Sequence, residues 1–216
     1  MSTPDGAILQ RDKMTYAIVP RTPAGMLTPD VLDTISYVCR KYEVPIIKIT
    51  SGQRMALVGM KEEQVEPIWE ELKWKVGRAT ELCVHYVQAC PGTAVCKMGV
   101  QDSLGFGLEI EEALHEKPFP AKVKFGISGC PLCCGESKVR DIGVIGTKKG
   151  WDVWVGGNTG PNPRIGDCIA KDLSQDDARA LILKFLEYYG ENSGKRVRIS
   201  KFVEKTGIDA IKEAIL

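Results

Sequence analysis

The sequence of 216 residues contains no apolar run close to the length of about 18 to 20 residues that a membrane-spanning helix requires. Its first residues, Met1 to Gly6, show no basic stretch followed by an apolar one, so no secretory signal is expected. Low-complexity segments and tandem repeats are also absent. These absences predict a soluble, cytoplasmic protein that has no contact with a membrane.

An excess of charge of either sign is missing as well. The 29 Lys and Arg residues face 28 Asp and Glu residues, which leaves a net charge of +1. A broad polyanion-binding surface is therefore not indicated, and we do not expect nucleic acid as a partner. The Gly-x-Gly-x-x-Gly pattern after a strand, typical of flavin- and nicotinamide-binding segments, is likewise absent.

The first part of the chain alternates patterns that are typical of strands and helices. Thr28 and Pro29 indicate a helix start, and the apolar residues after them recur at helical spacing. A second helix is indicated around residues 65–72. The expected strands are residues 15–19, 44–49 and 55–60. Together they predict a compact β-α-β-β-α unit over roughly residues 14 to 76.

The second part has its own series of patterns. Expected strands cover residues 82–89, 122–128, 142–147 and 151–156, and expected helices cover 101–116, 174–189 and 209–216. The alternation of Lys, Val, Lys and Phe from residue 122 predicts a strand with one face in water. Ser174 is expected to cap a helix that stops at Gly190.

Cysteine is abundant for a chain expected in a reducing compartment, where disulfides rarely persist. Five of the eight cysteines form two close groups, Cys90 with Cys96 and Cys130 with Cys133 and Cys134. Both groups lie in turns rich in Pro and Gly, whereas core cysteines would be scattered through periodic segments. Clusters of this kind more often hold metal or carry out redox chemistry.

Two kinds of metal site compete for these cysteines. Structural zinc sites usually have two to four residues between paired cysteines, and the five residues between Cys90 and Cys96 fit that spacing poorly. Four thiolates from Cys90, Cys96, Cys130 and Cys134 suit a 4Fe-4S cluster, because soft sulfur ligands match its iron. An iron-sulfur cluster is the preferred interpretation, and zinc is the alternative.

The spacing Cys-x5-Cys followed by Cys-x3-Cys, in the context Ser-Gly-Cys-Pro-x-x-Cys, resembles the siroheme-dependent sulfite and nitrite reductases. The segment from Ile47 to Gly59 resembles the family's Arg-Leu-Thr-x-x-Gln segment, and residues 156–158 resemble its Gly-Gly-Asn loop. The resemblance covers about residues 14 to 190 and is closest to the low-molecular-weight, assimilatory-type sulfite reductases. It implies an α+β fold, with a ferredoxin-like half-domain at residues 14–76 and a siroheme and 4Fe-4S binding domain at residues 77–216.

The resemblance also implies two cofactors and their ligands. The four cysteines of the motif would bind a 4Fe-4S cluster, and Cys134 would in addition supply the sulfur that joins the cluster to siroheme iron. Residues implied to contact siroheme are Lys48, Thr50, Gln53, Arg54, Gly156, Gly157 and Asn158. Lys48 stands where the family has an arginine, so a compact ammonium group replaces a planar guanidinium there.

Substrate binding is implied at four basic residues. Lys122 and Lys124 resemble the family's Lys-x-Lys pair that holds substrate, although alternate lysines on a strand ordinarily face solvent. Arg21 and Arg54 are further catalytic candidates, since a guanidinium matches an oxyanion. The sequence leaves open whether His85 and Cys133 have a role.

The function implied is the six-electron reduction of sulfite to sulfide. The reduction of nitrite to ammonia is the other possible reaction. Since no flavin or nicotinamide motif is present, electrons would come from a separate donor protein such as a ferredoxin or a reductase. Two alternatives stay open: a 4Fe-4S electron carrier, and a siroheme-binding subunit without catalysis of its own. The siroheme-type segment argues against the carrier, and the two lysines favour catalysis.

Overall fold

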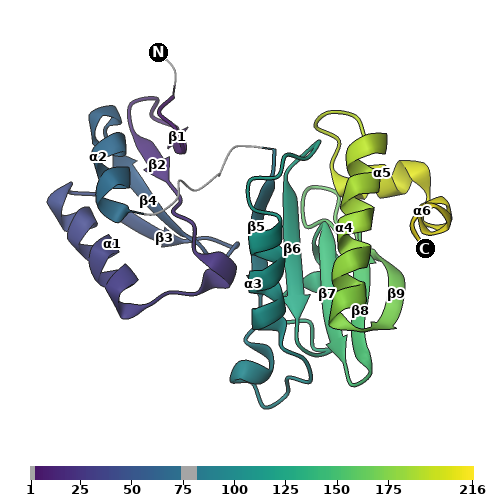
Figure 1. Ribbon diagram of the computed structural model, residues 1–216. Helices are drawn as coiled ribbons and strands as arrows, with labels where there is room; N and C mark the ends of the chain where they lie inside the picture. The colour runs from purple at the N-terminus through teal and green to yellow at the C-terminus, as the bar shows by residue number, and fades with distance from the viewer. Residues whose placement is uncertain (1–2, 74–81) are drawn as a thin grey trace. The chain divides into compact units, whose positions relative to one another are not determined.

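The computed structural model describes residues 3–73 and 82–216. The chain forms two compact units, residues 1–81 and 82–216, each with its own sheet and helices (Figure 1). The domain boundary expected between residues 76 and 77 lies outside the described residues. No helix in the described ranges is both long and apolar enough to cross a membrane.

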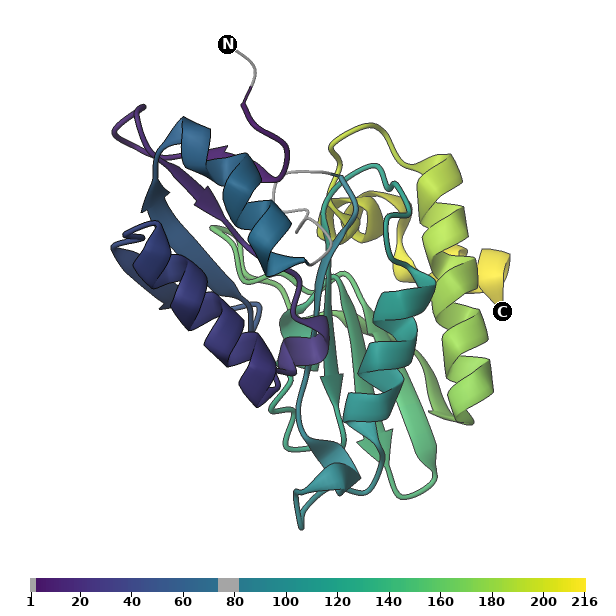
Figure 2. The ribbon, with the colours of Figure 1, turned by 60° about the vertical axis from the view of Figure 1, so that its left-hand side comes forward.

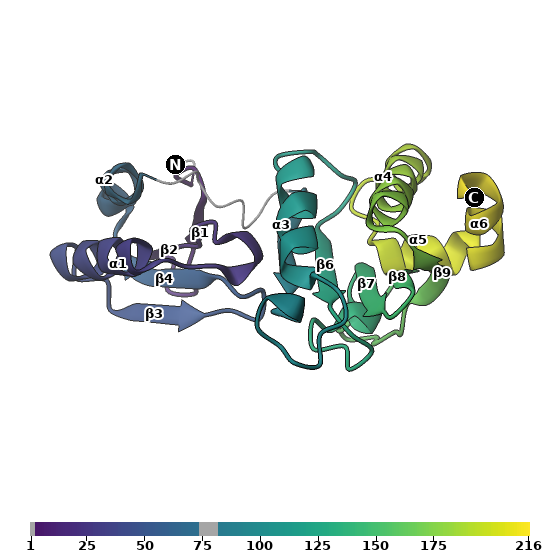
Figure 3. The same ribbon diagram turned by 60° about the horizontal axis from the view of Figure 1, so that its bottom comes forward.

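The first unit is a four-stranded antiparallel sheet with two helices. Its elements are β1 (Ala7–Leu9), β2 (Tyr16–Ile18), α1 (Pro29–Lys41), β3 (Ile46–Ile49), β4 (Met55–Met60) and α2 (Glu62–Leu72). The strands lie in the order β1-β2-β4-β3, and each neighbouring pair is antiparallel. Figure 3 shows both helices on the same side of this sheet.

The core of this unit follows from the helical spacing in the sequence. Thr28 caps α1 by accepting a hydrogen bond from the backbone N–H of Val31, and Pro29 occupies the first helical turn, as predicted. Ile35 and Val38 of α1 then pack in one buried cluster with Leu57 of β4 and apolar residues of α2. Strand β1, which has only three residues and one buried side chain, was not predicted from the sequence.

The second unit is a five-stranded mixed sheet. Its strands are β5 (Val84–Ala89), β6 (Val123–Ser128), β7 (Ile142–Thr147), β8 (Gly150–Val155) and β9 (Asp167–Leu173), in that order across the sheet. Its helices are α3 (Ser103–Ala113), α4 (Gln175–Asn192), α5 (Ile199–Thr206) and α6 (Ile208–Ile215). Strands β5, β6 and β7 are parallel, and β8 and β9 continue antiparallel.

The two faces of this sheet are covered differently. Helices α3 and α4 lie on one face (Figures 2 and 3), where Phe106 of α3 contacts Trp151 of β8 with ring centroids 5.0 Å apart. The opposite face carries the 3-10 segment η3 (Ser137–Val139), and Lys138 lies over the ring of Trp154 there. Trp151 and Trp154 therefore point to opposite faces, as their spacing in a strand requires.

Two expectations for the second unit were wrong. Strand β6 has no face in water: it lies between β5 and β7 with both faces covered, and only Lys124 is partly exposed along it. Helix α4 also runs through Gly190 to Asn192, because a single exposed glycine costs a helix too little to end it. Strand β9 and helix α5 were not predicted from the sequence.

Candidate active site

The first two cysteine loops lie at one edge of the second sheet. Cys90 follows β5 directly and Cys130 follows β6 by two residues. Since β5 and β6 are parallel, their carboxyl ends meet at the same edge. The backbone N–H of Cys90 donates to the carbonyl of Ile127, 3.0 Å away, which ties the two loops together where they begin.

The sulfur of Cys90 already receives backbone donation. The N–H of Gly129 points at Cys90 Sγ at 3.1 Å, and the Ser103 hydroxyl lies 3.2 Å from the same sulfur. An amide donor of this kind stabilises a thiolate and tunes a metal centre that it binds. The Ser103 hydroxyl itself donates to the Cys90 carbonyl at 2.8 Å. A glycine is required at 129 because a Cβ there would lie 2.8 Å from Gly92 Cα in the facing loop.

The second group of cysteines lies in a tight double turn. The N–H of Cys133 donates to the carbonyl of Cys130 (3.2 Å), and the N–H of Glu136 donates to the carbonyl of Cys133 (2.8 Å). Cys133 has a positive φ of 61°, and Cys130 is buried. Cys134 is exposed and so is Cys96, which leaves both sulfurs accessible to a bound group.

The ligand roles of the four cysteines stay a prediction. Within residues 3–73 and 82–216, no three His, Cys, Asp or Glu side chains are gathered closely enough to hold a single metal ion. A four-iron cluster is larger than one ion and takes one thiolate per iron, so its cysteines stand further apart.

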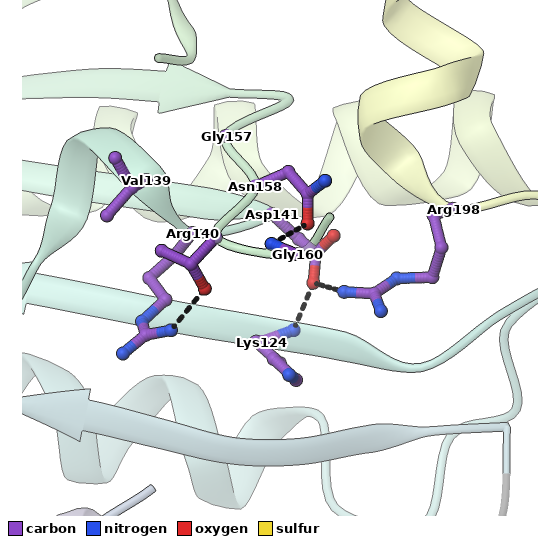
Figure 4. A pocket seen from close by; sticks show the side chains of 9 residues that line it. Lys124, Val139, Arg140, Asp141, Gly157, Asn158, Gly160 and Arg198 are labelled. Carbon is purple, nitrogen blue, oxygen red and sulfur yellow. Dashed lines mark hydrogen bonds and ion pairs between the residues drawn. The ribbon is translucent and has the colours of Figure 1, made fainter. Parts of the chain in front are cut away.

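A polar cavity of about 190 Å³ lies in the second unit (Figure 4). Its lining residues are Lys124, Val139, Arg140, Asp141, Gly157, Asn158, Thr159, Gly160 and Arg198. Three cationic side chains therefore share this cavity with one carboxylate. The excess of positive charge suits a small anion or a single carboxylate arm of a larger ligand.

Asp141 connects two of these cations. Its Oδ2 accepts a hydrogen bond from the backbone N–H of Lys124 at 2.9 Å and pairs with Arg198 Nη2 at 2.6 Å. Burial raises the pKa of this carboxyl, and Arg198 and the Lys124 N–H oppose that rise. We take the group as ionised, because one oxygen accepts from two donors, one of them a guanidinium.

Lys124 has an environment unlike that of a surface lysine. Burial lowers its pKa, the neighbouring positive charge of Arg198 lowers it further, and Asp141 acts in the opposite direction. Its Nζ lies 5.8 Å from the centre of the Tyr86 ring. The ordinary expectation of a solvated lysine is therefore wrong at this position. Lys122, two residues earlier, is partly buried as well.

Arg140 is the most buried of the three cations. Its guanidinium donates to Gln88 Oε1 at 2.8 Å, pairs with Glu136 and lies 5.7 Å from the Tyr86 ring centre. Neither Arg140 Nε nor Arg198 Nε has a hydrogen-bond partner in the part of the chain that the structure describes. Buried donors without partners are costly, and a ligand in the cavity could satisfy them.

The Gly-Gly-Asn loop borders the same cavity. Gly157 packs against the backbone of Arg140, where a Cβ would come within 2.5 Å of the Arg140 carbonyl oxygen. The side chain of Asn158 is used within its own loop: Oδ1 accepts from the N–H of Gly160 (3.0 Å), and Nδ2 donates to the carbonyl of Asn162 (2.8 Å). Asn158 thus shapes the loop that borders the cavity.

The candidates of the first unit gather around the β3–β4 turn. The turn is closed by the N–H of Thr50 donating to the Arg54 carbonyl (2.8 Å) and by the N–H of Gln53 donating to the Thr50 carbonyl (3.1 Å). The hydroxyl of Thr22, next to Arg21, donates to the Gln53 carbonyl at 3.2 Å. Arg21 therefore follows β2 beside this turn, and Lys48 lies exposed on β3 just before it.

Sequence reasoning missed Arg140, Asp141 and Arg198. None of them belongs to a motif, and Arg198 occupies the N-cap position of α5, which was not predicted. The signal in the sequence was the pair Arg140-Asp141 placed directly before a strong apolar strand, where charged residues can line a cavity. His85 is buried in β5, and it is not among the residues that line the cavity.

The residues present fit the two cofactors implied by the resemblance. Cysteine sulfur with directed N–H donors, as at Cys90, is the donor set of an iron-sulfur cluster. The cavity is too small for a whole tetrapyrrole, but its cations and orphaned buried donors match a carboxylate or an oxyanion.

Two family models match the chain, one in each unit. Residues 8–73 match the model of the nitrite/sulfite reductase ferredoxin-like half domain. Residues 81–216 match that of the nitrite and sulphite reductase 4Fe-4S domain. The expectation of these two domain types in an α+β chain is confirmed.

Individual proteins give the same answer. The chain is 73% identical over 213 residues to the assimilatory-type sulfite reductase of Nitratidesulfovibrio vulgaris, a match that covers 99% of this chain and 98% of that protein. It is 35% identical to the NAD(P)H nitrite reductase of Bacillus subtilis, covering 97% of this chain but 26% of that protein.

Two solved structures share the fold. A crystal structure of dissimilatory sulfite reductase I superposes with a TM-score of 0.84 at 15% identity, covering 93% of this chain and 69% of that one. The Mycobacterium tuberculosis NirA protein superposes with a TM-score of 0.80 at 20% identity, covering 96% of this chain and 42% of that one.

Proposed function

Because the chain belongs to the nitrite and sulfite reductase family, we propose that it is an enzyme that reduces sulfite to sulfide. Its cofactors are siroheme and a 4Fe-4S cluster. The observation that carries the proposal is the 73% identity to an assimilatory-type sulfite reductase over nearly the full length of both chains. The nitrite reductases are less similar and about four times as long, so nitrite is the second candidate substrate.

The candidate cofactor ligands form two groups, one within each unit. Cys90, Cys96, Cys130 and Cys134 would bind the cluster, and the exposed sulfur of Cys134 would also reach the siroheme iron. The basic and polar residues of the β3–β4 turn, Lys48, Thr50, Gln53 and Arg54, would bind siroheme carboxylates. When bound, the coupled centre supplies the electrons that the reduction consumes.

The chain's own contribution is to bind the anion and deliver protons. Lys124, Arg140 and Arg198 offer positive charge in a cavity that is partly removed from water, where such charge attracts an anion strongly. Lys124 can also donate a proton, since burial lowers its pKa. Lys122 would add a further cation, and the Gly156–Asn158 loop would shape the cavity edge. Arg21 and Arg54 of the first unit are the other candidates for binding the anion.

Electrons would come from a separate protein. Neither a flavin nor a nicotinamide fingerprint occurs in the sequence, so we propose a cytoplasmic donor such as a ferredoxin or a flavin-containing reductase. The donor has to come close to the cluster loops, where Cys96 is exposed.

The test is anaerobic purification followed by visible absorption, iron and acid-labile sulfide analysis. Bands of a reduced tetrapyrrole with about five irons per chain would support one siroheme and one cluster. Sulfite and nitrite are then each added to the reduced protein, and sulfide and ammonia are measured. Four irons without tetrapyrrole bands would indicate an electron carrier, and full cofactor content without turnover would indicate a siroheme-binding subunit.

A further inference from the structure

A single carboxylate oxygen joins three segments of the second unit. Asp141 precedes β7, and its Oδ2 accepts from the backbone N–H of Lys124 on β6 and from the guanidinium of Arg198 at the start of α5 (Figure 4). Asp141 and Arg198 are 57 residues apart in the sequence. The arrangement therefore depends on how α5 packs against the sheet, and it brings both charges next to the backbone of Lys124.

Stability alone is a weak reason for this ion pair. Asp141 is 2% exposed, and its second oxygen, Oδ1, has no hydrogen-bond partner among residues 3–73 and 82–216. Removing a carboxylate and a guanidinium from water costs about as much as their attraction returns, and apolar residues often serve as well. An incompletely satisfied pair beside a cationic cavity points to a role in the cavity.

The charges that face Lys124 come from every segment around it. Arg198 directly precedes α5, Arg140 precedes β7 and is itself paired with Glu136, and Lys122 directly precedes β6. All three favour the neutral amine, and among the described residues that act on Lys124 the carboxylate of Asp141 favours the ammonium. On the side of β5 the neighbour is the ring of Tyr86. Asp141 and Arg198 therefore act on Lys124 in opposite directions.

We propose that Asp141 and Arg198 are positioning residues for Lys124, which fix it in the cavity and together set how readily its ammonium gives a proton to the bound anion. This inference rests on the proposed function, because it takes Lys124 as the proton donor. In the step, the N–H bond of Lys124 breaks with its electron pair left on nitrogen, and the proton joins an oxygen of the anion. Each oxygen that leaves as water takes up two protons and two electrons, the electrons coming from the reduced cofactors, and solvent returns the proton to the lysine.

The test compares Asp141→Asn with Arg198→Gln in the cofactor-loaded protein. The first removes a negative charge beside Lys124 and lowers its pKa, and the second removes a positive charge and raises it. We expect the pH midpoint of Lys124 deprotonation to fall in the first variant and to rise in the second, each by roughly one pH unit. The midpoint is read in two ways: from the pH dependence of acetylation of Lys124 by acetic anhydride, followed by peptide mass spectrometry, and from the alkaline limb of the turnover rate with sulfite.

Two further variants serve as controls. Arg198→Lys keeps the positive charge and is expected to leave the midpoint near that of the unchanged protein. Lys201→Gln removes a charge from the same helix, where Lys201 pairs with Glu204 at the surface, and is expected to shift nothing. Iron content and the visible spectrum show whether each variant is folded and loaded. If Asp141→Asn does not fold, comparing Arg198→Gln with Arg198→Lys still shows whether loss of the positive charge raises the Lys124 midpoint.

Shifts in the same direction, or no shift in either variant, would overturn the proposal, since a merely structural pair predicts that outcome. Acetylation needs no turnover, so it separates this inference from the proposed function. If the midpoints shift in opposite directions in a protein that does not reduce sulfite, the role of Asp141 and Arg198 toward Lys124 stands and the proposed function is rejected. Turnover of sulfite with unmoved midpoints would reject the pairing alone.

Discussion

Cys133 and Cys134 are neighbours with the same side chain, yet their surroundings differ. Cys133 is partly buried with a left-handed backbone, and its N–H and carbonyl are both used in the turn. Cys134 is exposed and is the residue that resembles the family's bridging cysteine. The difference predicts different consequences of the same substitution.

We expect Cys134→Ser to remove the coupled centre and Cys133→Ser to keep it. Replacing a direct ligand should reduce sulfite turnover by more than the roughly 10- to 100-fold loss typical of an outer partner. The visible spectrum and iron content of the two variants check this. Equal iron content and equal spectra in both would contradict the assignment of Cys134.

Lys124 is the second residue whose surroundings decide its chemistry. We expect Lys124→Gln to lower turnover with sulfite by roughly 10²- to 10⁴-fold, the usual contribution of a proton donor. In the unchanged protein the rate should fall with rising pH at a value below the ordinary lysine pKa of about 10.4, because burial lowers the pKa of Lys124. Lys148→Gln, at an exposed position, is the control and should retain the rate.

At the scale of elements, η3 lies against a part of the sheet that is free of side chains. Gly126 of β6 and Gly143 of β7 face this segment, and a Cβ on Gly143 would lie 1.9 Å from the Ser137 carbonyl oxygen. The Ser137 hydroxyl donates to the carbonyl of Val144 at 2.9 Å and locks the contact. The segment leads from the cysteine loop to Arg140, so its position determines that of both.

We expect Gly143→Ala to destabilise the fold by roughly 1–3 kcal/mol, the usual cost of overpacking, and to reduce cofactor content. Gly190→Ala is the matched control, because that glycine lies in α4 and a Cβ added to it would have no atom within 4 Å. It should stabilise the helix by about 0.5–1 kcal/mol. Urea unfolding of both variants measures the change in the free energy of unfolding, which should fall for Gly143→Ala and rise for Gly190→Ala.

Element prediction from the sequence succeeded where one strong pattern covered the whole element. Strands β4 and β7 begin and end where the apolar runs do, and α1 starts at its Thr28 cap. It failed for β1, which has only three residues, and for β9, which has a single buried side chain. It also failed for α5, although α6 has the same length and was predicted. The wet face expected for β6 was wrong because η3 covers that side of the strand, where Gly126 lies against Ser137.

For the whole molecule, the cofactors should contribute to the stability of the folded state. A group that binds the folded chain and not the unfolded one shifts the equilibrium toward folding. We expect removal of iron by a chelator under reducing conditions to lower Tm, by about 2–4 °C for each kcal/mol of binding energy lost. Calorimetry before and after removal checks this, and an unchanged Tm would contradict binding of the cluster by the folded chain.

The sequence by itself determined the expected 4Fe-4S cluster and the two types of domain, and the family comparison confirms both. The reason is that cysteines a few residues apart in one turn are held close together by local backbone geometry. Their spacing can therefore be read directly from the sequence. Only the tertiary structure decided which charges meet at the cavity. Asp141, Lys124 and Arg198 lie on three separate segments, and they meet because the parallel pairing of β6 with β7 and the packing of α5 bring those segments together.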